Sequence, residues 1–354
     1  MLKRLIAMLA VTALLAGSIA FYYHKTGART DGVFYAATGI RPDAPLIYVD
    51  GDAVSAEEYF YWLDSVCEYL ASSLNAVPDF SAQVTDEMTL GQFAKADAAN
   101  TTILYAVARQ MAEEYGVTLH ADDVAALDAQ RAQYVAYYGS EEIYLQQLQI
   151  LGVTEELLRS IDEVPYLYNR MYQRYADPTD PLYPGEEALK AYAQEQGYVT
   201  AQLLYLTTEG LDETAKADMK TTAANYAAQL QAAADKQAVY ETLAGQLGLT
   251  VSEAGLTFCA ADSDTAVYEA VAALAPGQVS GVIETEGGCY VALGMEPNYA
   301  SLAEVLFNIR LQERQDSAKV EYSGKLYDSI DVTAFYTALY EARAALMLQL
   351  AGQS

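Results

Sequence analysis

Residues that could carry catalytic or metal chemistry are sparse in this chain of 354 residues. The two histidines, His24 and His120, and the three cysteines, Cys67, Cys259 and Cys289, lie far apart in the sequence. Isolated histidines exclude most catalytic arrangements built on an imidazole, and the cysteine spacing matches no zinc motif. We therefore expect no metal site and no cofactor, and we expect small buried thiols rather than a disulfide framework.

The charge of the chain is strongly unbalanced. It has 48 acidic and 20 basic residues, which give a formal net charge of −28. Such a charge repels phosphate backbones and anionic lipid, so nucleic acid is excluded as a partner. Because the acidic residues are spread over helical stretches, a solvated surface explains them.

The N-terminus has the pattern of a membrane-targeting segment. Lys3-Arg4 is followed by Leu5–Tyr23, a mostly apolar run of 19 residues, close to the ~20 that a helix needs to cross a bilayer. Residues 1–23 are therefore predicted to be a single-pass membrane anchor with the body outside the cytoplasm. Small residues at Ser18-Ile19-Ala20 leave a cleaved signal, and hence a secreted body, as the alternative.

The residues that follow the N-terminal segment, as far as Gln196, are predicted to form a linker, a strand and then an array of helices. Residues 24–45 mix glycine, proline and polar residues without a period, as a linker does. Leu46–Asp50 is predicted to be a short strand, and Ser55 is predicted to cap a helix that runs to about Leu74. Apolar stripes predict further helices over Leu90–Tyr115, Ala121–Tyr138, Ser140–Ile150, Thr154–Tyr175 and Glu186–Gln196, with Gly116, Gly139 and Gly152 as C-cap glycines.

The next part of the chain mixes helices with strands. Strand Val199–Thr207, helices Asp212–Ala234 and Ala238–Leu247, and a returning segment Thr250–Cys259 are expected in this order. A short helix then ends at Pro276-Gly277. Two β-rich runs, Val279–Thr285 and Cys289–Leu293, follow, and they are joined by Glu286-Gly287-Gly288 as a hairpin.

The last of these elements resemble the parvulin family of peptidyl-prolyl isomerases. The family pattern of a short helix, Leu-x-x-Gly-x-Val-Ser, Val-x-Thr and Gly-x-His corresponds to Leu274–Ser280, Val282–Thr285 and Gly288–Tyr290. Tyr240–Ala244 is similar to the family's Phe-x-x-Leu-Ala. The resemblance implies a small antiparallel sheet with helices, and a pocket that grips proline.

A second resemblance lies near the start of the body. Tyr48–Ser55 followed by Glu58-Tyr59 is similar to the opening of the SurA/PrsA-type foldases, in which the isomerase domain is inserted in a helical chaperone body. It implies an α+β fold whose C-terminal helices return to that body. We expect Leu302–Ser323 to be a helix, and Tyr327–Leu350 to hold a strand-like Ile330-Asp331-Val332 and another helix. The expected domains are the anchor 1–23, the linker 24–45, the helical body 46–196, the parvulin-like domain 197–297 and the returning helices 298–354.

The parvulin resemblance also implies positions for the site. In that family, two histidines form the polar floor of the site, and their positions correspond to Gln202 and Tyr290. The position of the family's acidic residue corresponds to Leu249, and that of the aromatic residue in its proline pocket corresponds to Val267. No catalytic residue is therefore assigned. The residues expected to border a bound substrate are Gln202, Leu256, Val267, Thr285 and Tyr290. Gln202 and Tyr290 are expected to hydrogen-bond to each other across neighbouring strands.

The function implied is that of a membrane-anchored, extracytoplasmic foldase that binds unfolded or proline-containing exported polypeptides, with its isomerase activity lost. Two alternatives remain open. One is an active peptidyl-prolyl isomerase that uses Gln202 and Tyr290, and the other is a structural subunit of an envelope complex.

Overall fold

The structure is a computed structural model that describes residues 29–352. The predicted anchor at residues 1–23 lies outside this range. Within it, no helix is both long and apolar enough to cross a membrane. The fold is α+β and mostly helical, with antiparallel sheets of two, three and four strands, so this part of the predicted fold class is confirmed.

The described chain divides into two compact units. Residues 29–171 together with 311–352 form one unit, here called the body, and residues 172–310 form the inserted unit. The divisions fall within helices α7 (Glu155–Ala176) and α12 (Ala303–Ser317). The boundaries expected at residues 196/197 and 297/298 lie inside the inserted unit, because α8 (Glu186–Gln196) packs on the 3₁₀ turn Tyr299–Leu302.

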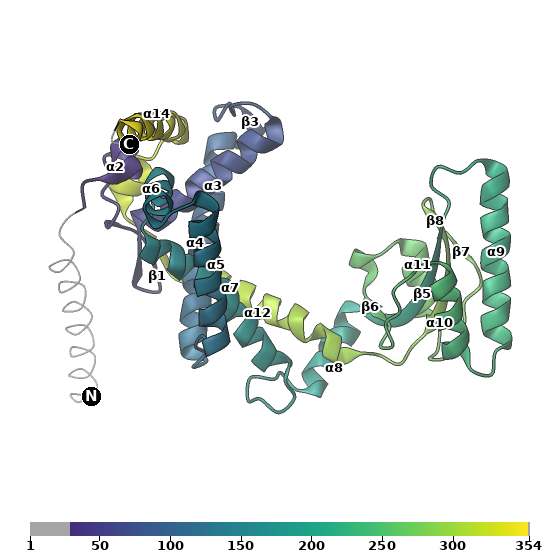
Figure 1. Cartoon of the computed structure of the whole chain (residues 1–354). Helices are drawn as coiled ribbons and strands as arrows, with labels where there is room; N and C mark the ends of the chain where they lie inside the picture. Colours follow the sequence, from purple (N-terminus) through teal and green to yellow (C-terminus); the bar gives the residue numbers. More distant parts are fainter. Residues whose placement is uncertain (1–28, 353–354) are drawn as a thin grey trace, which may run out of the picture. The chain divides into compact units, whose positions relative to one another are not determined.

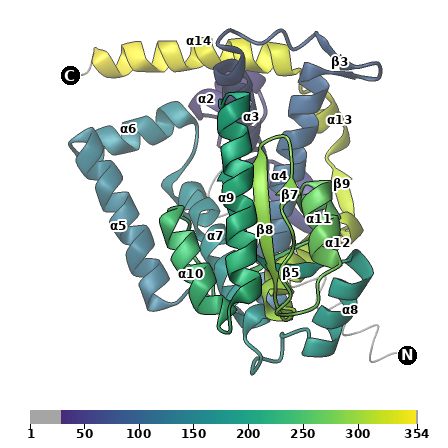
Figure 2. The same ribbon diagram turned by 90° about the vertical axis from the view of Figure 1, so that its right-hand side faces the viewer.

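The body is a helical array with a small sheet (Figures 1 and 2). Its helices are α2 (Gly32–Thr38), α3 (Ala56–Leu74), α4 (Leu90–Glu114), α5 (Ala121–Tyr138), α6 (Glu141–Leu151), the first part of α7, the last part of α12, α13 (Gly324–Asp328) and α14 (Val332–Ala351). Its strands are β1 (Pro45–Val49), β2 (Asp52–Ser55), β3 (Gln83–Thr85), β4 (Met88–Thr89) and β9 (Val320–Tyr322). β1 lies between β2 and β9, while β3 and β4 form a separate hairpin.

Local signals fix most helix ends. The Ser55 hydroxyl accepts a hydrogen bond from the backbone N–H of Glu58, which begins α3 where the sequence predicts it. Gly139 and Gly152 end α5 and α6 at φ of 93° and 92°, a conformation that favours glycine. The helices predicted between Ser55 and Tyr175 therefore match α3 to α7 within one or two residues.

The predicted linker at residues 24–45 holds a helix that its composition does not reveal. Val33 and Phe34 of α2 are buried, and the Phe34 ring lies 5.7 Å from Phe60 and 6.2 Å from Phe335, centroid to centroid. These aromatic contacts stabilise a short helix through partners distant in sequence.

The C-terminal return also differs from the prediction. The helix expected over Leu302–Ser323 ends at Ser317, and β9 then adds to the edge of β1, with Tyr48 opposite Glu321. The strand-like Ile330-Asp331-Val332 is not a strand, because the Asp331 carboxylate accepts from the N–H of Ala334 and caps α14.

The inserted unit is built on a four-stranded antiparallel sheet. Its strands are β5 (Val199–Thr207), β6 (Leu256–Phe258), β7 (Ile283–Glu284) and β8 (Gly288–Gly294), in the order β6-β5-β8-β7. Helices α9 (Glu213–Ala232) and α10 (Lys236–Gln246) cover one face, and α11 (Thr265–Ala272) covers the other, as Figure 1 shows. The element order is the predicted one, although β7 is much shorter than the predicted run Val279–Thr285.

Candidate functional site

The two faces of the inserted sheet have different surroundings. Side chains alternate between faces along a strand, and residues directly opposite on paired strands share a face. Leu204 and Val291 are opposite each other and belong to the core under α9 and α10. Ala201 and Ala292 belong to the core under α11. The sheet therefore has an α9/α10 face and an α11 face.

Gln202 lies on the α9/α10 face. It is opposite Leu293 and only 2% exposed. Its Nε2 donates to the carbonyl oxygen of Ser252 at 2.9 Å, while its Oε1 is buried with no hydrogen-bond partner. The side chain therefore ties the loop after α10 to β5 and is closed off from a substrate.

Tyr290 lies on the α11 face. It is opposite Tyr205, and the two rings stack at 4.6 Å between centroids with 28° between their planes. The register places Gln202 and Tyr290 on opposite faces of the sheet. The prediction of a hydrogen bond between them is therefore wrong. Side chains on opposite faces of the sheet cannot line one polar site together.

Tyr205 is a residue of this face that is not among those predicted from the sequence. Its hydroxyl donates to the carbonyl oxygen of Gly287 at 2.8 Å, which holds the ring over the β7–β8 hairpin. A Cβ on Gly288 would lie 2.3 Å from the Leu206 carbonyl oxygen and 2.8 Å from the Tyr205 ring. Glycine is needed there so that the ring can approach. Alternation along Val199–Thr207 places the side chains of Tyr205 and Gln202 on opposite faces of the sheet. Only the pairing register shows that Tyr290 is the neighbour of Tyr205.

The other predicted substrate-binding residues are scattered. Val267 of α11 is buried on the same face as Tyr290. Leu256 of β6 is 55% exposed and pairs with Ala201 of β5. The Thr285 hydroxyl donates to the Gly288 carbonyl at 3.1 Å and so supports the hairpin turn. Leu249, the position to which the resemblance assigned an acid, packs on the α9/α10 face.

The α11 face is suited to binding rather than proton transfer. Burial raises the pKa of Tyr290, and Tyr205 and Asp264 raise it further, so the phenol stays neutral at pH 7. The Asp264 carboxylate accepts from the N–H of Ala266 as the cap of α11. Stacked rings with a half-buried Leu203 beside them offer area to an apolar side chain.

A second candidate surface lies on the body. Large apolar side chains are exposed on α3, on the loop that follows it and on α14: Tyr69, Leu74, Val77, Tyr340 and Leu348. We call these five residues the apolar surface. Tyr69 is 72% exposed and Leu348 is 76% exposed. Exposed apolar side chains of this kind offer area against which the apolar side chains of a polypeptide can be buried.

Ring contacts, an ion pair and a hydrogen bond hold together the elements that carry the apolar surface. The ring of Phe80, which follows α3, meets Tyr336 of α14 at 5.5 Å. Arg343 of α14 binds Asp64 of α3 at 2.6 Å and donates to the Ile150 carbonyl at 2.8 Å. Figure 2 shows α14 and the β3–β4 hairpin at the same end of the body.

One group of potential metal ligands occurs in the described residues. Atoms of His120, Asp122 and Asp123 lie within 4.8 Å of one another. The Arg170 guanidinium donates to both carboxylates, at 2.7 Å to Asp122 and 2.8 Å to Asp123. Arg170 therefore already binds both carboxylates of this cluster.

The three cysteines are free thiols. Cys67 and Cys289 are buried, and Cys259 is half-buried. Burial raises the pKa of Cys67 to about 12, so this thiol stays protonated and behaves as a small apolar group.

Comparison with known proteins gives structural neighbours only. No protein-family model matches the chain, and no curated protein matches its sequence. Solved structures that match include PrsA of Bacillus subtilis, at 15% identity and a TM-score of 0.28, covering 76% of this chain and 92% of that one. The foldase protein PrsA of Streptococcus pneumoniae matches at 18% identity and a TM-score of 0.28, covering 84% and 94%. One of two SurA-like chaperones of Campylobacter jejuni matches at 16% identity and a TM-score of 0.21, covering 79% and 100%. The structural neighbours are thus PrsA and SurA-like chaperones.

Proposed function

We propose that this protein is a foldase-type chaperone that holds unfolded polypeptides and does not catalyse prolyl isomerisation. The observation that carries the proposal is the placement of Gln202 and Tyr290 on opposite faces of the sheet. Catalysis requires groups that stabilise the twisted amide together at one place. The two sequence positions that would supply them are separated by the sheet itself.

The apolar surface of the body supports the holding function. An unfolded chain exposes apolar side chains, and each square ångström buried against the protein contributes about 25 cal/mol. A formal net charge of −28 keeps molecules of this protein apart while the surface remains exposed. The SurA/PrsA-like motif at Tyr48–Ser55 lies in this same unit, in β1 and β2.

The proposal includes a location. The basic start and apolar run at residues 3–23 favour a membrane anchor with the body outside the cytoplasm. Exported polypeptides would then be its clients. Protease added to intact cells should digest the body of an anchored chain, and complete protection would contradict this location.

The holding function is tested by suppression of the aggregation of a denatured client. We expect the Tyr69→Ser, Leu348→Ser double variant to need about ten times more protein for half-suppression, which corresponds to about 1.4 kcal/mol. Tyr137→Ser is the matched control, since Tyr137 is 81% exposed on α5 and outside the apolar surface. Equal activity of the double variant and the wild type would contradict the proposal.

The isomerase question has its own readout. Uncatalysed X–Pro isomerisation takes tens to hundreds of seconds, so a tenfold acceleration is plain in a refolding trace. We expect none from the full-length protein. Acceleration abolished by Tyr290→Phe would instead establish an isomerase on the α11 face. A partner that co-purifies in fixed stoichiometry, with no holding activity, would favour a structural subunit.

A further inference from the structure

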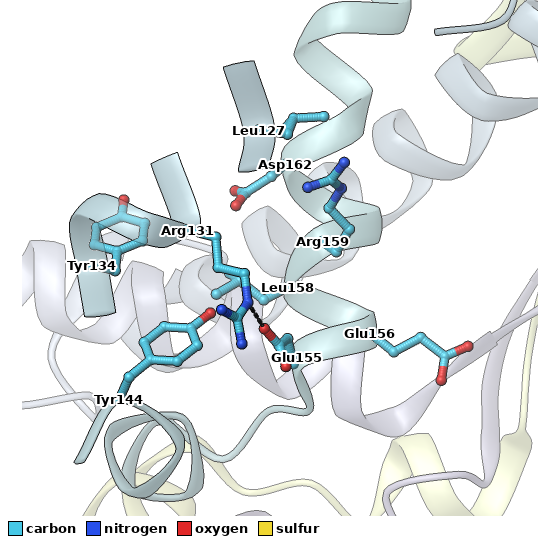
Figure 3. Close-up of a pocket in the computed structure, with 9 residues that line it drawn as sticks. All are labelled: Leu127, Arg131, Tyr134, Tyr144, Glu155, Glu156, Leu158, Arg159 and Asp162. Atoms are coloured by element: carbon cyan, nitrogen blue, oxygen red, sulfur yellow. Dashed lines mark hydrogen bonds and ion pairs between the residues drawn. The ribbon is translucent and has the colours of Figure 1, made fainter. Parts of the chain in front are cut away.

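A cavity of about 320 Å³ lies between α5, α6 and α7 of the body (Figure 3). This volume falls at the lower end of the range of ligand pockets, which is about 300–1,000 Å³. Leu127 and Leu158 give it apolar walls, and Tyr134 and Tyr144 add aromatic rings. The cavity belongs to none of the surfaces described above.

Two arginines border the cavity, and both are already neutralised. Four carboxylates bind them: Glu141 and Glu155 at Arg131, and Asp128 and Glu163 at Arg159. Arg131 also lies over the Tyr144 ring, 5.3 Å from its centroid. Neither guanidinium is therefore left to attract an anion.

Acidic groups remain in excess around the cavity. Glu156 and Asp162 also line it, so six carboxylates stand against two guanidinium groups, a formal excess of four negative charges. At neutral pH the cavity therefore attracts cations, and walls of low polarity strengthen that attraction.

Asp162 is the acid best placed to receive a cation. Figure 3 shows its carboxylate pointing from α7 into the space beside α5. Its hydrogen bond comes from a neutral amide, the Nε2 of Gln130, at 3.3 Å. Partial burial raises the pKa of Asp162, against the opposing effect of Arg159, because the ionised form is incompletely solvated. A cation bound there would compensate the lost solvation.

We propose that this cavity binds the basic side chain, lysine or arginine, of an extended polypeptide client, with its charged end at Asp162 and its methylene stem against Leu127 and Leu158. Basic side chains have this combination of a long apolar stem and a cationic tip. Tyr134, 43% exposed, adds a ring face for the cation. The inference rests on the proposed function, since it names the clients that a holding chaperone of this charge would select.

The test uses the full-length protein and two labelled peptides. Both are short Gly-Ser chains, one with a central Leu-Arg-Leu and the other with Leu-Gln-Leu, and binding is followed by fluorescence anisotropy. We expect the arginine peptide to bind about ten times more tightly at low ionic strength, and this preference to shrink as salt is raised. Equal binding of the two peptides would overturn the inference, and so would tighter binding of a Leu-Glu-Leu peptide.

Variants locate the site. Asp162→Asn keeps the shape of the side chain and should abolish the preference for arginine, while Glu142→Gln, which removes the same charge from an exposed position on α6, should leave it intact. Tyr134→Ala, at an exposed position, should weaken the arginine peptide about threefold and provides a second reading if Asp162→Asn fails to fold. An unchanged preference in a folded Asp162→Asn or Tyr134→Ala variant would contradict the site.

Two further arms separate the alternatives. Free arginine amide should compete only weakly, because it lacks the flanking leucines; equal competition would assign the cavity to small cations and overturn a polypeptide occupant. Aggregation suppression is scored separately on a client without lysine or arginine. If the protein binds the arginine peptide preferentially but does not suppress aggregation, only the proposed function is contradicted. If it suppresses aggregation but shows no preference for the arginine peptide, only this inference is contradicted.

Discussion

Gln202 is a buried residue whose amide is only half satisfied. Its Nε2 pairs with the Ser252 carbonyl, while Oε1 has no partner. We expect Gln202→Ala to lower the free energy of unfolding of the inserted unit by about 3 kcal/mol, because it opens a cavity and leaves the Ser252 carbonyl without its donor. Tyr290→Phe keeps the stacked ring and should cost less than about 0.5 kcal/mol. Urea unfolding measures both, and similar costs would show that Gln202 is not a tie to the loop.

Asp50 carries a pH-dependent contact in the body. Its carboxylate accepts from the Lys319 N–H at 2.8 Å and binds Arg314 at 2.5 Å, and these two partners, in that order, lower its pKa. A lowered pKa contributes stability that is present above the ordinary value of 3.8 and is lost as the pH falls through the folded-state value. Asp50→Asn should therefore cost up to about 1 kcal/mol at pH 7, and the difference from wild type should vanish in acid.

The Asp50 prediction is checked by urea unfolding at a series of pH values. Asp86→Asn, at an exposed position in the β3–β4 turn, is the control and should keep the wild-type pH profile. If the difference in free energy of unfolding between Asp50→Asn and wild type stays the same in acid, the loss of stability does not come from the ion pair. It then comes from the turn, in which Asp50 has a φ of 52°.

At the scale of elements, the turn between α6 and α7 holds α2 in place. A Cβ on Gly152 would lie 2.8 Å from the Phe34 ring, whereas a Cβ on Gly139 would meet nothing within 4 Å. The two glycines have nearly equal φ, 92° and 93°, so alanine suffers the same backbone strain at both. We expect Gly139→Ala to cost about 1 kcal/mol and Gly152→Ala about 3 kcal/mol, as measured by thermal unfolding. Equal costs would mean that α2 is not seated on this turn.

At the scale of the whole molecule, the body depends on both ends of the described chain. β9 pairs with β1, and α14 buries Val332, Phe335, Tyr336 and Leu339. A chain that ends after Arg310 lacks these elements, so we expect calorimetry to show loss of the cooperative transition of the body while the inserted unit, complete in residues 172–310, still unfolds cooperatively. Retention of both transitions would contradict the division into these units.

The sequence by itself determined most of the helices and their order. Their signals are local: the Ser55 cap, the C-cap glycines and the apolar stripes act within a few residues, so α3 to α8 could be located without partners. The hairpin glycines also placed β8, since Gly287-Gly288 is a turn signal wherever the chain folds.

Only the tertiary structure decided which residues meet. The face on which Gln202 or Tyr290 lies depends on strand register, and a shift of one residue reverses it, so the motif spacing could not show that the two are separated or that Tyr205 stacks on Tyr290. Likewise α2 exists because Phe34 finds Phe60 and Phe335. The cavity at Asp162 forms where three helices converge. These features rest on contacts between residues far apart in the sequence, whose free energy appears only when the chain is folded.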